Sequence, residues 1–165
     1  AKLDVITRRL PINVIIETDN REMSIGAKRN LLLSKATSEY TMFLDDDDDL
    51  DRDAFKWILK ALEDKPDCCE LKGILTIDGR HPKTFIHSID YSTYFEKNGV
   101  YYRPPNHLNP IKREIAQSYL FPENNFGEDT NWAMQIAKAK VLKTMGRVPD
   151  VWYYYNWRNG VSTTS

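Results

Sequence analysis

The chain has 165 residues, of which 41% are hydrophobic and 28% charged, and its formal net charge at pH 7 is −1. These values fit one globular domain with a core of its own and exclude a disordered chain. The near-neutral charge gives no general attraction to nucleic acid or to an anionic membrane. No segment is long and apolar enough for a transmembrane helix, and none has the pattern of a signal peptide.

Two apolar, β-prone runs in the first third of the chain are followed by acidic residues. Residues 12–16 predict a strand, and Asp19 follows its end. Residues 40–44 predict a second strand, which leads directly into five aspartates at positions 45–49. If the two strands are parallel neighbours, Asp19 lies beside the aspartates. Open α/β sheets bind ligands at this edge, beyond the carboxyl ends of the strands.

The aspartate run itself allows two interpretations. Five adjacent carboxylates repel one another unless a cation lies among them, and Mg²⁺ or Mn²⁺ prefers such oxygen ligands. Alternatively, the run is a solvated loop in which Asp51 and Asp53 cap the following helix. Because the run directly follows a predicted buried strand, the two interpretations are about equally supported by this segment alone.

Between the two runs, the sequence predicts a helix with positive charge near its start. Ser24 is a suitable N-cap for a helix over residues 26–36, and Lys28 and Arg29 lie in its first turns. A helix N-terminus with such cations is a good binding place for a phosphate. A solvated helix face is an equally good interpretation of the two side chains.

The next elements continue an alternation of helix and strand. Asp53 opens a predicted helix with one apolar face, and residues 71–77 predict another strand. This alternation predicts a parallel sheet with right-handed crossovers. The adjacent Cys68 and Cys69 have a poor geometry for a disulfide with each other, so we expect a reducing compartment and a cytoplasmic protein.

The second half of the chain predicts a hairpin, two helices and a final strand. An Asn-Gly pair between aromatic arms predicts a β-hairpin over residues 94–102. An Asn-Pro pair predicts a helix over residues 111–118, and a further helix is expected over residues 130–140. Glu128 and Asp129 lie at the start of that last helix, where the periodicity leaves them exposed. An aromatic strand is expected over residues 151–156.

Three segments in this order resemble family 2 glycosyltransferases with the GT-A fold. Residues 25–50 resemble the Arg-Asn helix and Asp-x-Asp block of that family. Residues 126–136 resemble its Glu-Asp block, and residues 152–158 its closing aromatic strand. Order and spacing match over residues 12–158. The resemblance implies an α/β fold with a mixed, mainly parallel sheet flanked by helices and a small β-hairpin.

The resemblance also implies one domain over residues 1–165. Residues 1–80 would form its nucleotide-sugar half, and residues 81–165 its half for the acceptor and the catalytic base. Family members normally begin with a strand that forms the floor of the base pocket, and this chain begins after that point. We therefore expect the first strand to be missing from the chain.

The activity implied by the resemblance is metal-dependent transfer of a sugar with inversion. The expected donor is a nucleotide-sugar, with a UDP-sugar first, and the acceptor is a saccharide or another molecule with a hydroxyl. Asp45 and Asp47 match the Asp-x-Asp positions: Asp45 would lie toward the ribose, and Asp47 would hold Mn²⁺ or Mg²⁺ on the diphosphate. Asp46 and Asp48 form an alternative register.

The other site residues are assigned by the same resemblance. Asp19 matches the acid that contacts the base, and Lys28 and Arg29 match the basic helix start near the nucleotide. Asp129 matches the general base and Glu128 the residue that orients the acceptor.

Many relatives supply a late histidine to the metal from the closing strand, where this chain has tyrosine and asparagine. His107 is then the candidate metal ligand or acceptor contact, and a surface position is its simpler interpretation.

Other functions remain open at this point. A degenerate GT-A-like domain would bind nucleotide or saccharide without catalysis, and the missing first strand favours it. A metal-dependent nuclease or phosphoryl-transfer enzyme would need further acids on another strand, and none stands out. The near-neutral charge gives no support to a nucleic-acid acceptor and leaves that variant open.

Overall fold

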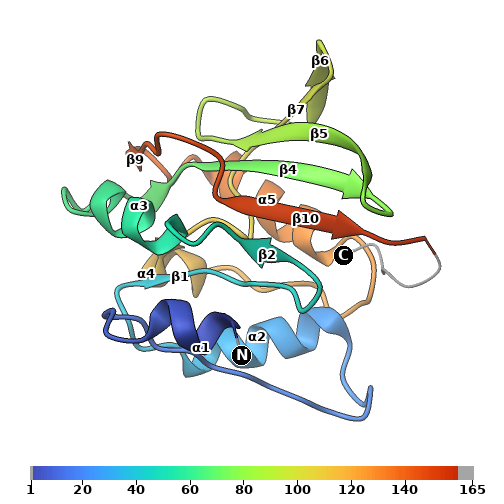
Figure 1. Ribbon diagram of the computed structural model, residues 1–165. Helices are drawn as coiled ribbons and strands as arrows, with labels where there is room; N and C mark the ends of the chain where they lie inside the picture. Colours follow the sequence, from blue (N-terminus) through green and yellow to red (C-terminus); the bar gives the residue numbers. More distant parts are fainter. Residues whose placement is uncertain (1, 160–165) are drawn as a thin grey trace.

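The computed structural model describes residues 2–159, which form two β-sheets with helices around them (Figure 1). The strands are β1 (Tyr40–Thr41), β2 (Asp49–Leu50), β3 (Cys68–Cys69), β4 (Leu71–Ile77), β5 (Arg80–His87), β6 (Phe95–Lys97), β7 (Val100–Arg103), β8 (Ile111–Lys112), β9 (Met145–Gly146) and β10 (Tyr153–Trp157). The helices are α1 (Lys2–Thr7), α2 (Ile25–Lys35), α3 (Ala54–Ala61), α4 (Arg113–Ala116) and α5 (Glu128–Ala139).

The larger sheet has the strand order β2-β10-β4-β5-β7-β6, and the smaller has β1-β8-β3-β9. In Figure 1, α1 and α2 lie below β1 and β2, α5 lies behind β10, and β6 stands at the opposite end of the molecule. The predicted mixed α/β fold with flanking helices is confirmed. The prediction of a mainly parallel sheet is wrong, because only three of the eight described strand pairings are parallel.

A tight hairpin between β4 and β5 accounts for part of this difference. Asp78 and Gly79 connect the two strands and have φ values of 51° and 75°. Such positive angles at both central residues match the right-handed twist of antiparallel strands, and Asp-Gly is a frequent pair there. The same geometry recurs at Asn98 and Gly99, with φ values of 52° and 76°, which confirms the predicted hairpin between β6 and β7.

The predicted strand over residues 12–16 is wrong. This segment is extended but joins neither sheet, and the main-chain groups of residues 13–18 form no hydrogen bond with another described main-chain group. Val14, Ile15 and Ile16 are exposed as a result, the last with a relative exposure of 76%, whereas Ile12 packs against the core. A β-prone run forms a strand only where a partner strand satisfies its backbone.

Two apolar clusters hold the described elements together. The first packs α3 against the larger sheet and contains Trp152, which is completely buried. The second joins α2 and α5, and in it Phe121 stacks on Trp132 with the ring centroids 4.6 Å apart. Gly26 allows the start of α2 to approach the segment before α5, because a Cβ there would lie 1.7 Å from the Pro122 carbonyl oxygen. This second cluster fixes the position of α2 relative to α5.

Several smaller predictions are corrected or confirmed. Residues 111 and 112 belong to β8, so the helix predicted there is the short α4. Cys68 and Cys69 lie in β3 as buried free thiols, which agrees with the absence of a disulfide between them. No helix in the described part of the chain has the length and apolar character needed to cross a membrane.

Candidate active site

Arg29 of α2 connects the aspartate run to α5. Its guanidinium donates hydrogen bonds to Glu128 Oε1 at 2.6 Å and to Asp45 Oδ1 at 3.2 Å. The Phe43 and Phe121 rings lie 6.0 and 5.8 Å from the guanidinium carbon. Three segments that are distant in sequence therefore meet at one buried cation, which is engaged by carboxylates rather than open to a phosphate.

The start of α5 is buried, which corrects the prediction that Glu128 and Asp129 are exposed. Glu128 has a relative exposure of 0% and Asp129 of 7%. The helix begins at Glu128, and the preceding Gly127 is left-handed with φ at 72°. Gly127 adopts this conformation without a Cβ penalty, and the change of chain direction there turns both acids inward.

Asp45 has a strongly stabilised negative charge. Burial alone would raise its pKa, but His107 and the Arg29 guanidinium outweigh this effect and hold the pKa at about 2. His107 Nε2 lies 3.8 Å from Asp45 Oδ2, beyond hydrogen-bonding distance. Burial and the nearby Arg29 charge lower the pKa of His107. Arg29 keeps its charge at any physiological pH and is therefore the permanent countercharge of Asp45.

His107 lies on a buried loop, not on the surface. The Phe43 main-chain N–H donates to the His107 carbonyl at 2.8 Å, which ties the loop to the segment just before the aspartates. Asn109 links the same loop to β3, because its side-chain amide donates to the Cys69 carbonyl at 3.0 Å. Neither ring nitrogen of His107 forms a hydrogen bond with a described residue. Buried polar groups normally have partners, so this imidazole is available to a ligand.

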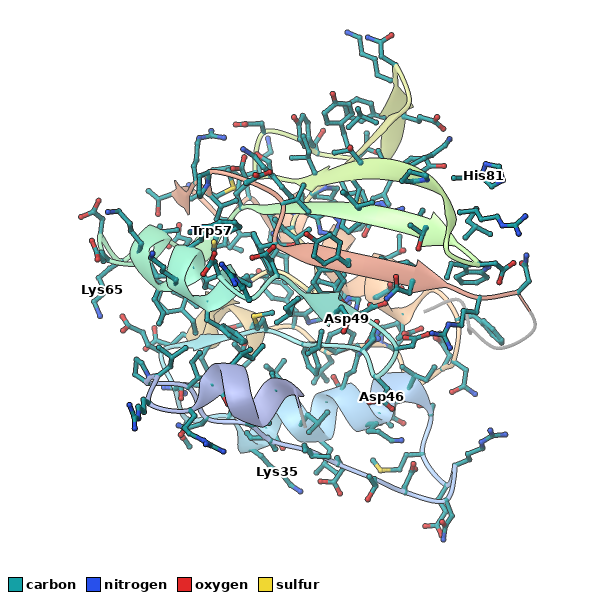
Figure 2. The ribbon with its side chains drawn as sticks, in the orientation of Figure 1. Lys35, Asp46, Asp49, Trp57, Lys65 and His81 are labelled. Atoms are coloured by element: carbon teal, nitrogen blue, oxygen red, sulfur yellow. The ribbon has the colours of Figure 1, made fainter. Side chains whose placement is uncertain are left out.

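The remaining aspartates of the run differ in their environments. Asp46 and Asp47 are exposed, and Figure 2 shows Asp46 on the loop between β1 and β2. Asp48 is buried and accepts hydrogen bonds from the Tyr153 hydroxyl and the Asn156 main-chain N–H. Burial raises the pKa of Asp48 to about 7. Both oxygens of Asp48 are thus engaged by the closing segment of the chain, which favours the Asp45 and Asp47 register over Asp46 and Asp48.

The contacts of Asp19 do not involve the aspartate run. Its carboxylate pairs with Lys28 Nζ at 2.5 Å and accepts a hydrogen bond from the Met23 N–H at 2.9 Å. The hydrogen bond from Lys28 lowers the pKa of Asp19. The prediction that two neighbouring parallel strands bring Asp19 beside the aspartates is wrong, because residues 12–16 join no sheet.

Two cavities meet at Asp45. The larger has a volume of about 1870 Å³ and is lined by the aspartate run, the start of α2 and residues 12–16. The smaller has a volume of about 380 Å³, and Asp45, His107 and Asp129 all lie in its wall. Glu128 lines neither cavity. Its carboxylate contacts Arg29 instead. Ligand pockets commonly measure about 300–1,000 Å³, so the smaller cavity has room for a compact ligand between Asp45 and Asp129.

The comparison with protein families decides the membership of the chain. The model of glycosyl transferase family 2 matches residues 3–142. The chain belongs to glycosyl transferase family 2. The comparison with curated protein sequences gives no match.

Solved structures of S. aureus TarS share the fold of this family 2 chain. The crystal structure of TarS has a TM-score of 0.56 and 18% identity, and the match covers 86% of this chain and 25% of that one. TarS 1–349 gives 0.57 and 17%, with 86% and 42% covered. TarS 1–349 in complex with UDP-GlcNAc gives 0.58 and 17%, with 96% and 47% covered. The chain thus spans less than half the length of these proteins, and the expected GT-A fold is confirmed.

The sequence motifs of family 2 do not reveal the whole wall of the smaller cavity. Tyr94, Asn106, Thr130 and Tyr155 also line it, and no spacing or motif singles them out. They come from four separate segments, and only the folded sheet brings them together. Arg103 also lines this cavity, and its place in the wall follows from the pairing of β7 with β5.

Proposed function

We propose that the chain transfers a sugar from a nucleotide-sugar, with a UDP-sugar as the first candidate, to an acceptor hydroxyl with inversion. The observation that carries this proposal is that Asp45 and Asp129 line one cavity of about 380 Å³, while Asp45 also lines the larger cavity with the rest of the aspartates. Membership of family 2 supports sugar transfer. The UDP-GlcNAc complex of TarS 1–349 supports the choice of donor.

The proposed reaction needs a cation at the diphosphate, and we assign Mn²⁺ or Mg²⁺ to Asp47 and Asp45, with His107 as a third candidate. Among the side chains that the structure describes, there is no group of three or more from His, Cys, Asp or Glu that could hold a metal by itself. Mg²⁺ at phosphate sites is often bound by only one or two carboxylates together with substrate phosphates. The exposed Asp47 and the ionised Asp45 fit that arrangement. When bound, the cation would neutralise charge on the departing diphosphate.

Asp129 is the proposed general base. It lies in the wall of the smaller cavity, and its Oδ1 accepts a hydrogen bond from the Thr130 N–H at 2.8 Å. This bond holds the carboxylate at the N-terminus of α5, where the helix dipole stabilises negative charge. A carboxylate in this place can take the proton of an acceptor hydroxyl that attacks from the cavity.

Glu128 is proposed as a positioning residue. Its bond to Arg29 joins α5 to α2, and Arg29 in turn holds Asp45. The acid that opens α5 thereby sets the distance between the donor side and the acceptor side of the site. This role replaces the direct acceptor contact that the resemblance implied, because Glu128 lines neither cavity.

A degenerate domain that only binds nucleotide or saccharide is the second candidate. The exposed apolar segment at residues 12–16 favours it, because one wall of the larger cavity is built from a run that joins no sheet. The two candidates differ in turnover. The test is a panel of nucleotide-sugars with Mn²⁺ or Mg²⁺ and a mixture of saccharide acceptors, with release of nucleoside diphosphate as the readout. Metal-dependent release supports transfer, and UDP binding without any release supports the second candidate.

A further inference from the structure

We propose that the acceptor carries an anionic group, a phosphate or a carboxylate, close to its reacting hydroxyl, and that Arg103 binds this group. This inference rests on the proposed function and names the acceptor class for the same site. Arg103 is the last residue of β7 and lines the smaller cavity together with Asp129. The cavity therefore presents a carboxylate for the hydroxyl and a guanidinium for a negative charge.

The guanidinium of Arg103 lacks an acceptor within the described chain. It forms no ion pair with a described carboxylate and donates no hydrogen bond to a described residue. Other arginines that are withdrawn from solvent do have such partners: Arg29 contacts two carboxylates, and Arg113 donates to the Ser38 carbonyl and to Gln117. Arginine has five N–H donors and remains charged at any physiological pH. A half-buried guanidinium without an acceptor, aimed at a cavity, is suited to an anionic ligand.

Two aromatic rings fix the orientation of this guanidinium. Its central carbon lies 5.4 Å from the ring centre of Tyr94 and 5.7 Å from that of Tyr101. Stacking of this kind attracts the cation without using its N–H donors. The donors remain available as a fork, which matches the two oxygens of a carboxylate or phosphate. The side chain is thus held in place before the ligand arrives.

The position of Arg103 separates this anion site from the nucleotide. Arg103 lines only the smaller cavity, whereas Lys28 and the aspartates at positions 46–49 line only the larger one. The diphosphate is assigned to the aspartates, so the anion at Arg103 belongs to the molecule that approaches Asp129. The Tyr94 hydroxyl is buried in the same wall and forms no hydrogen bond with a described residue, which gives the acceptor a further polar contact.

The first test compares acceptors in matched pairs. Glycerol with glycerol 3-phosphate, and methyl glucoside with methyl glucuronide, differ in charge and keep a hydroxyl. With a UDP-sugar that the chain consumes, kcat/KM for UDP release should be about ten- to hundredfold higher for the charged member, as expected for hydrogen bonds to a charged group. Arg103→Gln should bring this ratio close to one, and Arg103→Lys should give an intermediate ratio. Arg8→Gln is the matched control, since Arg8 is exposed and lines neither cavity.

Equal kcat/KM for charged and neutral acceptors in the wild type would overturn the inference and leave the proposed function intact. The inference would also be overturned if Arg103→Gln weakened UDP binding as much as it reduced the preference for charged acceptors. Arg103 would then bind the donor. Circular dichroism and thermal melting establish that each variant is folded, and Arg103→Lys retains the charge if Arg103→Gln does not fold.

A second readout is independent of turnover. Binding of glycerol 3-phosphate is followed by broadening of its ³¹P NMR signal, which detects weak complexes. The wild type and Arg8→Gln should broaden the signal, and Arg103→Gln should not. If no donor is consumed but this broadening depends on Arg103, the proposed function fails and the anion site stands. Equal broadening by Arg103→Gln and the wild type overturns the anion site.

Discussion

Replacement of Arg29 by methionine tests the connection between the aspartate run and α5. The substitution keeps much of the side-chain volume and removes the charge that holds Glu128 at 2.6 Å and Asp45 at 3.2 Å. Glu128 has a relative exposure of 0%, so its carboxylate would be left buried without a countercharge. Breaking a buried pair on one side costs about 3–5 kcal/mol. That is a large part of the roughly 5–15 kcal/mol that stabilises a typical domain.

Urea unfolding followed by tryptophan fluorescence measures this loss. In thermal unfolding, each kcal/mol corresponds to about 2–4 °C in Tm for a chain of this size, so Arg29→Met should lower Tm by roughly 6–20 °C. Arg52→Met is the matched control, because the Arg52 side chain is 90% exposed and only approaches Asp53 at 4.0 Å. A loss below about 1 kcal/mol in Arg29→Met would show that the bridge does not hold the site together.

The loss should also depend on pH in a defined direction. Burial raises the pKa of Glu128 in the folded state. A raised pKa means that the folded state keeps a proton that the unfolded state has released, so stability falls as pH rises through the folded value. Arg29 opposes this shift, and its removal enlarges it. The deficit of Arg29→Met should therefore be smallest in acid and grow toward neutral pH, and a deficit that shrinks toward neutral pH would contradict the assignment.

Three further predictions address other parts of the site. Because the pKa of Asp48 is raised to about 7, this carboxyl group lowers the stability of the fold as pH rises from about 4 to 7. In urea unfolding, Asp48→Asn should therefore reduce the dependence of stability on pH in this range. An unchanged dependence would contradict the burial of the Asp48 carboxyl group. Gly26→Ala places a Cβ 1.7 Å from the Pro122 carbonyl oxygen, so it should destabilise the fold by about 1–3 kcal/mol or more, whereas wild-type stability would refute the close approach. Asp47→Asn should weaken Mn²⁺-dependent UDP binding in calorimetry, and unchanged affinity would transfer the ligand role to a neighbouring aspartate.

Elements with strong local signals were predicted well from the sequence. The helix α2 has Ser24 as its N-cap, with the side chain accepting from the Ala27 N–H at 3.1 Å, as the capping pattern indicated. The hairpin at Asn98-Gly99 was also predicted correctly. In each case, residues a few positions apart determine the conformation, so the chain itself carries the necessary information.

The errors concern features that depend on distant segments. Residues 12–16 have strong β propensity, but a strand needs a partner edge, and none of the described strands supplies one. Glu128 and Asp129 were assigned to the surface by helical periodicity, which takes no account of the turn at Gly127. The pairing of Arg29 with Glu128 spans 99 positions and has no local signature. The motifs of the site were therefore visible in the sequence, and the way they contact one another was not.

The most direct measurement of the proposed function is the turnover of Asp129→Asn beside that of Asp64→Asn, with UDP binding measured for both. Asp64 is exposed and lines neither cavity, so Asp64→Asn controls for the loss of one carboxylate. Removal of a general base typically costs about 10²–10⁴-fold in rate. We expect Asp129→Asn to lose sugar transfer by that factor while it binds UDP like the wild type. Transfer by Asp129→Asn at the wild-type rate would contradict the assignment of the two carboxylates to opposite sides of one reaction.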